Sequence, residues 1–309
     1  MSIYITIDGG TTNTRISLVK NGTLTDTVRY QIGARASIED KAPLRTAVRE
    51  GIAALLSRNG LVEGDVHRIL ASGMITSEFG LYRLDHLIAP AGIAELHRAM
   101  EEVLLPEISP IPFVFMRGVR TEGDVATADV MRGEETELMG LSPQGNCVYV
   151  LPGSHSKIIH TDECARIRDF CTTLTGEMIA SLSANTILKS SIELSNNTPD
   201  REYLIKGFET CEQLGFNAAL FKTRICDTVK HLSKPQIYAY FMGVILHDEV
   251  KRIQSLSPAS VTIGGKRPIR DALTTLLESV GVRVCPLSQK EIDESVPLGA
   301  VAVYEYAMH

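Results

Sequence analysis

The chain has 309 residues, of which 44% are hydrophobic and 22% are charged, and its formal net charge is −6. This composition is typical of a globular protein, and the length allows two domains and a large core. The negative charge argues against a nucleic-acid-binding surface, which is normally basic, and no apolar run is long enough to span a membrane.

Two further features bear on location and metal content. None of the six cysteines forms a C-x-x-C pair, so we expect no zinc site and cysteines that are mostly reduced, small, buried side chains. The first residues lead directly into a strand pattern, without a basic segment or an apolar signal-peptide core. We therefore expect a cytoplasmic protein.

The chain opens with a predicted meander of three strands. Ile3, Ile5 and Ile7 alternate with more polar residues, which predicts a strand, and two further strands are predicted over 16–20 and 23–32. Asn21-Gly22 separates those two strands, and this dipeptide is the strongest short-range signal for a hairpin because both positions need a positive φ.

The loop between the first two predicted strands is the most informative part of the sequence. It reads Asp8-Gly9-Gly10-Thr11-Thr12-Asn13-Thr14-Arg15. Small and hydroxyl-bearing residues can present backbone N–H groups to an anion, and a neighbouring carboxylate can hold Mg²⁺ through water. The loop therefore predicts a nucleotide phosphate site. The alternative is a tight hairpin whose glycines only turn the chain.

Two better-known phosphate loops do not fit this sequence. The chain contains no G-x-x-x-x-G-K-[ST] segment, and the dinucleotide-binding fingerprint should be followed by a helix, whereas a strand follows here.

The rest of the first half alternates predicted helices and strands. Helical spacing is present over 42–57 and 93–105, and strand patterns over 68–73 and 113–120. Pro106, Pro110 and Pro112 are expected to exclude a helix or a central strand, so we interpret this stretch as a linker before the second half.

The second half follows a similar plan. Its predicted strands cover 147–151, 156–161, 166–170, 261–263 and 282–285. One predicted helix begins near 132, and four others cover 176–188, 236–253, 269–280 and 296–306. Strands followed by alternating strands and helices in each half predict an α/β fold with mixed sheets. A cleft between two such halves is the natural place for a ligand.

Three further motifs could contribute to a site. The segment Met131–Glu137 opens a predicted helix with three glutamates. Acidic residues are favourable at a helix start, and we interpret Glu137 in that way. Glu134 or Glu135 could also act as a general base that accepts a proton from an attacking hydroxyl.

The other two motifs are glycine-containing turns. Leu151-Pro152-Gly153-Ser154-His155-Ser156-Lys157 combines glycine, hydroxyls and a cation, which suits a phosphate or a carboxylate; the alternative is an ordinary Pro-Gly turn with a surface lysine. Gly264-Gly265 follows a predicted strand and would let a flat ligand approach the backbone; the alternative is a simple turn that places Pro268 at the start of a helix.

The order of these pieces resembles that of the sugar kinase, hexokinase and actin-like ATPase superfamily. At closer range, four segments resemble the signatures of 2-keto-3-deoxygalactonate kinases. They are Asp8–Arg15, Val130–Leu138, Leu151–Lys157 and Thr173-Leu174-Thr175-Gly176-Glu177. The resemblance covers essentially the whole chain. It departs from the family at Gly9, where many members are expected to carry a bulky aromatic residue, and at 72–77, which matches loosely.

This resemblance implies a two-domain actin-like ATPase (ribonuclease H-like) fold with an active-site cleft between its lobes. The N-terminal lobe is expected over 1–115, with the first phosphate loop and much of the sugar-acid site. The C-terminal lobe is expected over 116–309, with the second phosphate loop and the adenosine site, while its last helix could pack back on the N-terminal lobe.

The implied activity is ATP-dependent phosphorylation of the terminal (6-) hydroxyl of 2-keto-3-deoxygalactonate or a close sugar acid. Such a transfer depends on positioning and charge neutralisation, with closure of the domains over both substrates. We assign Mg²⁺ to Asp8, the base to Glu134 by analogy with related sugar kinases, and Glu135 as its alternative. The expected ATP contacts are Gly10, Thr11, Thr12, Asn13, Arg15, Gly153, Ser154 and His155 at the phosphates, and Gly264 and Gly265 at the adenosine.

The substrate carboxylate needs a cation, and arginine can bind it with two hydrogen bonds. We assign Arg132 and Lys157 to it, while Arg35, Arg83 and Arg117 stay open. Two other functions remain: a kinase of another sugar, and a non-catalytic ATP-binding regulator of the same fold, against which the run of glutamates argues. Beyond a small-molecule sugar acid we expect neither a nucleic-acid nor a membrane partner, and the sequence leaves a homodimer open.

Overall fold

The computed structural model describes residues 2–308, which form two compact units. Of these residues, the first unit comprises 2–146, 161–169 and 289–308, and the second comprises 147–160 and 170–288. The chain therefore passes from the first unit to the second more than once. The mixed α/β class predicted from the sequence is confirmed.

The main sheet of the first unit begins with the predicted meander. Strands β1 (Ile3–Gly9), β2 (Thr14–Lys20) and β3 (Thr23–Tyr30) are joined in antiparallel pairs, and β1 also pairs in parallel with β4 (Arg68–Gly73). The full order is β3-β2-β1-β4-β7-β6. Asn21 and Gly22 both have positive φ, at 49° and 72°, as the hairpin signal predicts.

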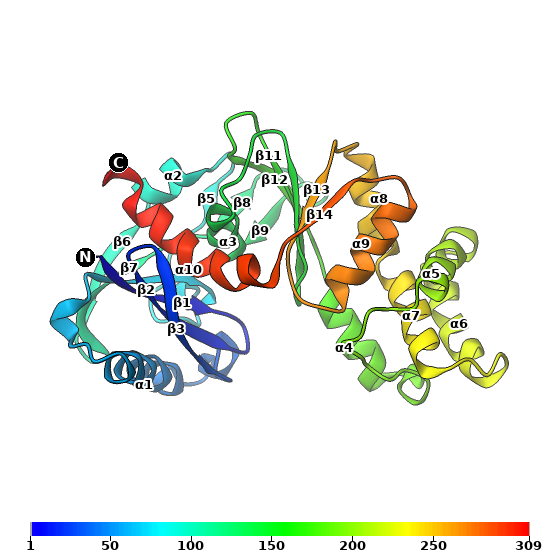
Figure 1. The fold of residues 1–309 in the computed structure, drawn as a ribbon, viewed down its shortest axis with the longest axis horizontal. Coiled ribbons are helices and arrows are strands. Elements are labelled where there is room, and N and C mark those ends of the chain that lie inside the picture. The colour runs from blue at the N-terminus through cyan, green and yellow to red at the C-terminus, as the bar shows by residue number, and fades with distance from the viewer. Residues whose placement is uncertain (1, 309) are drawn as a thin grey trace. The chain divides into compact units, whose positions relative to one another are not determined.

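Two helices cover this sheet, one on each face (Figure 1). Alternate residues of β1 point to opposite faces. Ile5 belongs to the core cluster that contains Leu44 of α1 (Ala42–Arg58), whereas the Tyr4 ring contacts Tyr304 of α10 (Gln289–Glu305) edge-on at 5.5 Å. The isoleucine alternation in the sequence therefore marks the face that α1 covers.

Two sequence predictions in this unit are wrong. The expected helix over 93–105 ends as α2 (Ile93–Arg98), and its second part is strand β6 (Glu101–Leu105). The expected linker is part of the sheet, because Pro110 and Pro112 lie within β7 (Ser109–Phe115). These prolines precede the residues that pair with β4, and they lie where the β6–β7 register is irregular. Their missing N–H groups therefore cost few hydrogen bonds between strands.

Helix α3 (Glu134–Gly140) packs closely against α10. A Cβ at Gly140 would lie 1.8 Å from the Ser295 carbonyl oxygen, and a Cβ at Gly299 would lie 2.0 Å from that of Thr136. The two helices approach so closely because glycines lie at the crossing, and this contact fixes the position of α3.

The second unit is built around strands β10 (Val148–Leu151), β11 (Ser156–Thr161), β13 (Val261–Ile263) and β14 (Val284–Pro286). The strand order of this sheet is β12-β11-β10-β13-β14. The expected long helix over 236–253 is two helices, α7 (Lys234–Ile245) and α8 (His247–Ser255). Helix α7 is buried over most of its length and contributes much of the core.

Helices α7, α8 and α9 lie beside one another in this unit (Figure 1). The remaining elements are η1 (Ala34–Ser37), η2 (Glu63–Asp65), η3 (Met74–Thr76), β5 (Leu87–Ile88), β8 (Val119–Thr121), β9 (Asp129–Met131), β12 (Ile167–Thr173), α4 (Thr175–Asn185), η4 (Ile187–Ser190), α5 (Arg201–Leu214), α6 (Phe216–Thr228), α9 (Ile269–Ser279) and η5 (Tyr306–Met308). Across residues 2–308, no helix is both long enough and apolar enough to cross a membrane.

Candidate active site

The first candidate phosphate loop is a tight connection between β1 and β2. The backbone N–H of Gly10 donates to the Asn13 carbonyl oxygen at 2.8 Å, and the strands pair up to Gly9 and Thr14 on either side. Thr11, Thr12 and Asn13 are exposed at its tip. The local sequence thus forms the hairpin loop that was predicted, with its hydroxyl-bearing side chains open to solvent.

A second segment, not predicted from the sequence, supports this loop. The N–H groups of Ala34 and Arg35 donate to the carbonyl oxygens of Gly10 and Thr11, at 3.1 and 2.9 Å. A Cβ at Gly33 would lie 2.5 Å from the Gly10 oxygen, so only glycine allows this approach. A glycine directly after the third strand was the available signal, but it did not indicate which loop it would contact.

Asp8 lies at the carboxyl end of β1. Its Oδ2 accepts a hydrogen bond from Arg15 Nη2 at 2.8 Å, because the two residues are opposite each other in the β1–β2 register. Both side chains are about a quarter exposed. A Cβ at Gly73, the last residue of β4, would lie 3.4 Å from Asp8 Oδ1. Asp8 therefore lies between Arg15, to which it is hydrogen-bonded, and the end of the neighbouring strand β4.

The start of α3 lies next to the same strand end. Gly133 precedes this helix with a φ of 118°, and a Cβ there would lie 3.2 Å from the Gly73 Cα. Glycine at both positions permits the close approach. The structure thus places the first turn of α3, with its glutamates, near Asp8 within one compact unit.

The two candidate bases in this turn have different surroundings. Glu135 is fully buried, and both of its carboxyl oxygens accept from the Gly133 N–H, at 2.9 and 2.7 Å. Glu134 is partly exposed, and its Oε2 accepts from the Arg132 N–H at 3.1 Å. Glu135 therefore holds the helix start in place, whereas Glu134 is closer to solvent.

Burial and neighbouring charge change the acidity of this group of carboxylates. Burial, aided by the charge of Glu134, raises the pKa of Glu135 to about 7. Burial also raises the pKa of Glu137 to about 8, with further increases from the charges of Glu134 and Asp8 and an opposing effect of Arg15. Glu137 is thus electrostatically coupled to Asp8, which its expected role at a helix start did not indicate.

Arg132 is held by the segment that follows β4. Its Nη1 donates to the Thr76 carbonyl oxygen and hydroxyl, at 2.9 and 2.6 Å, and its Nη2 donates to the Leu84 carbonyl oxygen at 3.0 Å. Its other neighbour, His86, lies 3.3 Å away, and burial lowers the pKa of this histidine to about 4. Much of the donor capacity of Arg132 is therefore already used within the protein.

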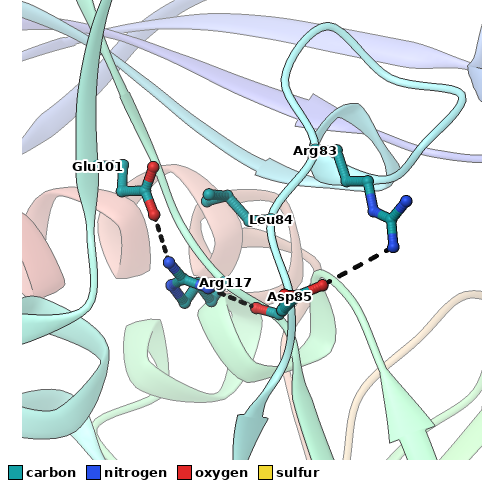
Figure 2. Close-up of a pocket in the computed structure, with 5 residues that line it drawn as sticks. All are labelled: Arg83, Leu84, Asp85, Glu101 and Arg117. Atoms are coloured by element: carbon teal, nitrogen blue, oxygen red, sulfur yellow. Dashed lines mark hydrogen bonds and ion pairs between the residues drawn. The ribbon is translucent and has the colours of Figure 1, made fainter.

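A small polar pocket of about 210 Å³ lies nearby in the same unit (Figure 2). Arg117 is held there by the carbonyl oxygens of Ala99 and Asp85, both at 3.0 Å, and by the carboxylate of Glu101. Arg83 is 69% exposed, and its nearest carboxylate oxygen, on Asp85, is 3.9 Å away. Of these two arginines, Arg83 is the more accessible to a ligand.

The second candidate phosphate loop joins β10 to β11. Gly153 and Ser154 are exposed, and His155 Nε2 lies 3.2 Å from Glu177 Oε1. The Glu177 N–H donates to the Ser154 carbonyl oxygen at 3.2 Å. Lys157, expected at the substrate, is only 4% exposed and lies in β11.

The late Gly-Gly turn lies against this second loop. The Gly264 N–H donates to the Val150 carbonyl oxygen at 2.8 Å. Gly265 has a φ of 71°, and a Cβ there would lie 2.6 Å from the Pro152 carbonyl oxygen. The structure therefore brings together two motifs that are more than a hundred residues apart in the sequence.

The described side chains contain no group of three or more histidine, cysteine, aspartate or glutamate residues arranged to hold a metal ion.

Comparison with solved structures defines the class of protein. The fold matches a putative 2-dehydro-3-deoxygalactonokinase from Sinorhizobium meliloti, at 21% identity and a TM-score of 0.80, over 98% of this chain and 99% of that one. It also matches a xylulose kinase from Lactobacillus acidophilus, at 9% identity and a TM-score of 0.54, over 100% and 90%. The chain thus has the fold of the actin-like ATPases and sugar kinases, as predicted.

Sequence comparison narrows the class to a family. The family model for 2-keto-3-deoxy-galactonokinase matches residues 8–296. A 2-dehydro-3-deoxygalactonokinase of Escherichia coli K12 is 27% identical over 259 residues, which cover 80% of this chain and 79% of that protein. The chain belongs to the 2-keto-3-deoxy-galactonokinase family, as the sequence motifs predicted.

Proposed function

We propose that this protein uses ATP to phosphorylate the terminal (6-) hydroxyl of 2-keto-3-deoxygalactonate or a close 2-keto-3-deoxy sugar acid. Membership of the family supports this activity. The structural observation that supports it most is the position of the α3 start, with its glutamates, beside Asp8 and the first phosphate loop. An enzyme that performs this metabolic step with ATP is expected in the cytoplasm.

The first loop is suited to ATP phosphates. Thr11, Thr12 and Asn13 form the exposed tip of a turn that begins at Gly10, and backbone N–H groups and hydroxyls are typical donors to phosphate oxygens. Arg15 would leave its contact with Asp8, or share it, to reach a phosphate. An arginine that is only a quarter exposed is well placed to bind without a large loss of side-chain freedom.

Asp8 is the residue that we assign to Mg²⁺. Magnesium binds hard oxygen donors and usually keeps several waters, so one carboxylate together with nucleotide phosphates is a normal ligand set. The acidic surroundings of Asp8 fit this assignment, because the charges of Asp8 and Glu134 both contribute to the raised pKa of the neighbouring Glu137. A bound cation would neutralise charge that develops on the transferring phosphoryl group.

Glu134 remains our choice for the general base. A base must reach the hydroxyl proton of the substrate, and Glu134 is partly exposed whereas Glu135 is buried with both oxygens bound to Gly133. The pKa of Glu135, about 7, would suit a base at neutral pH, so Glu135 stays the alternative. Accessibility rather than acidity supports the choice.

In the second unit, we propose that Gly153, Ser154 and His155 contact phosphate, and that Gly264 and Gly265 contact the adenosine. The close packing of Gly265 on Pro152 supports a shared nucleotide site for these two turns.

We propose that one of several basic side chains binds the carboxylate of the substrate. Arg132 and Lys157 remain candidates, although Arg132 already donates to Thr76 and Leu84 and Lys157 is buried. Arg83 and Arg35 have more exposed side chains and are the better placed of the residues that stayed open.

The test is a substrate screen. The protein is incubated with Mg-ATP and, separately, with 2-keto-3-deoxygalactonate, 2-keto-3-deoxygluconate, xylulose and N-acetylmannosamine, and both ADP and phosphorylated product are measured by mass spectrometry. We expect a phosphorylated sugar acid and ADP in equal amounts. ADP formed without any phosphorylated acceptor would instead indicate a regulator, and phosphorylation of a neutral sugar alone would change the substrate class.

A further inference from the structure

A buried carboxylate lies beneath the second phosphate loop. Glu249, on α8, is 1% exposed, and none of the roles proposed above involves it. An ionised carboxylate in the protein interior is costly unless it is paired or well hydrogen-bonded. Its surroundings therefore indicate why this residue is tolerated there.

Three hydroxyl groups surround Glu249. Its Oε1 accepts hydrogen bonds from Thr173 Oγ1 and Thr175 Oγ1, and these two hydroxyl oxygens are 2.8 Å apart. Ser156 faces the carboxyl closely enough to lower its pKa, against a larger increase from burial. Neither Ser156 Oγ nor Glu249 Oε2 has a hydrogen bond of normal geometry within residues 2–308.

The hydroxyl-bearing residues belong to the segments that form and support the second loop. Ser156 directly follows the loop residue His155, at the start of β11. Thr173 ends β12 and Thr175 begins α4. Glu249 therefore connects α8 to the β12–α4 junction by hydrogen bonds, and it faces Ser156 at the exit of the loop.

That junction in turn contacts the loop backbone. A Cβ at Gly176 would lie 2.4 Å from the Gly153 carbonyl oxygen, and the Glu177 N–H donates to the Ser154 carbonyl oxygen at 3.2 Å. Glu177 also lies 3.2 Å from the His155 ring nitrogen. Each residue of the loop that we assign to phosphate thus contacts a neighbour of Thr175.

We infer that Glu249 is a positioning residue for the second phosphate loop: through Thr173 and Thr175 it fixes the β12–α4 junction, and with it the backbone of Gly153–His155, for a nucleotide phosphate. This inference rests on the proposed function. Glu249 is 1% exposed and its hydrogen bonds go to Thr173 and Thr175, so it would act on the loop through these residues and not by contact with phosphate. Its effect is on the position of the loop's donors, to which phosphate binding is sensitive.

The experiment compares nucleotide binding by the full-length protein and its variants. Binding of ADP and of adenosine is measured by calorimetry for the wild type, Glu249→Ala, Glu249→Gln and the exposed control Glu202→Ala, alongside thermal unfolding. Adenosine carries no phosphate, so it reports on the nucleoside site alone. Glutamine keeps an oxygen that can accept from both threonines.

We expect Glu249→Ala to weaken ADP binding by about 10- to 100-fold, because a displaced loop would lose one or two of its own hydrogen bonds to the charged phosphate. Adenosine affinity should be unchanged, Glu249→Gln should bind ADP within about threefold of the wild type, and Glu202→Ala should match the wild type. Equal losses for ADP and adenosine would show a merely structural role, and unchanged ADP affinity would show none; either result overturns the inference.

Replacement variants at Thr175 and the binding of nucleotide by the wild type complete the experiment. If Glu249→Ala does not fold, Thr175→Val and Thr175→Ser replace it: the valine variant should lose ADP affinity selectively and the serine variant should retain it, and equal behaviour of the two would overturn the inference. A wild-type protein that binds neither ADP nor ATP would contradict the proposed function, and the inference with it. Wild-type binding with no selective effect of any variant removes the inference alone.

Discussion

At the scale of single residues, the first unit places like charges close together. The charges of Glu134, Asp8 and Glu135 all raise the pKa of Glu137, and the charge of Arg15 opposes them. Such an arrangement is unfavourable by itself, and carboxylates whose pKa values are pushed apart by their surroundings are a common property of catalytic sites.

Asp8→Asn is expected to abolish most of the kinase activity. The amide keeps the shape of the side chain but removes the charge that we assign to Mg²⁺. The activation free energy should therefore rise by several kcal/mol, which lowers kcat on the order of 10²-fold or more. The measurement is turnover at saturating Mg-ATP, with the exposed Glu50→Gln as a control. Near-normal turnover of Asp8→Asn would remove Asp8 from this role.

Glu134→Gln and Glu135→Gln should separate the two candidate bases. Loss of a general base typically lowers the rate by about 10²–10⁴-fold, so we expect this loss for Glu134→Gln with ADP binding intact. Glu135→Gln should mainly lower stability, because the amide can accept from the Gly133 N–H through one oxygen only. The opposite pattern, with phosphorylation lost only in the Glu135 variant, would exchange the two assignments.

At the scale of elements, short contacts at glycines set the position of the site. Gly33 allows the segment after β3 to reach the first candidate phosphate loop, and Gly140 and Gly299 allow α3 to lie against α10. The loop and the helix start are thereby held by segments that are distant in sequence.

Gly33→Ala is expected to displace the first phosphate loop. The new methyl group would lie 2.5 Å from the Gly10 oxygen, which forces one of two backbone segments to move. Overpacking of this kind typically costs about 1–3 kcal/mol, and we expect a matching rise in the KM for ATP. Gly64→Ala is the control, because a Cβ there meets no atom within 4 Å. Equal behaviour of the two variants would show that the contact is unimportant.

Gly299→Ala tests the α3–α10 crossing. Alanine is intrinsically better than glycine inside a helix by about 1 kcal/mol, so an isolated helix would gain stability. Here the methyl group would lie 2.0 Å from the Thr136 oxygen, and we expect a net loss of about 1–3 kcal/mol in the free energy of unfolding. Denaturant unfolding measures it, and a more stable variant would show that the helices can separate without cost.

At the scale of the whole molecule, the two compact units need not unfold together, so a single unfolding transition is not expected. The raised pKa values of two carboxylates on α3 give the first unit its own dependence on pH. Folding raises the pKa values of Glu135 and Glu137 from 4.5 to about 7 and about 8. At pH values between the unfolded and the folded pKa of each carboxylate, the folded unit therefore binds more protons than the unfolded chain.

The first unit should therefore lose stability as the pH rises from about 5 to about 8, because a raised carboxyl pKa stabilises the fold only at lower pH. Amide hydrogen exchange in α3, measured at both pH values, reports on this unit separately. The slope should be smaller in Glu137→Gln, which cannot ionise. A wild type whose protection is the same at both pH values would show that these carboxylates ionise without cost.

Much of the architecture was predictable, and the failures have a common cause. The opening meander, its Asn21-Gly22 turn and the strand before Gly264 depend on local periodicity and turn chemistry, and the structure has them as predicted. The 93–105 pattern failed because apolar residues at helical spacing also fit a strand, and only pairing with β7 decides between them.

The sequence by itself determined the family and the fold class. It also predicted residues for phosphate and metal, because turn-forming glycines, hydroxyls and carboxylates have strong local preferences. The tertiary structure decided which of these residues are buried, which are already bonded to the protein and which lie together. Glu135 and Glu137 have raised pKa values, and Arg132 is held by Thr76, because segments distant in sequence exclude water around them. Burial and proximity are properties of packing, which no local pattern contains.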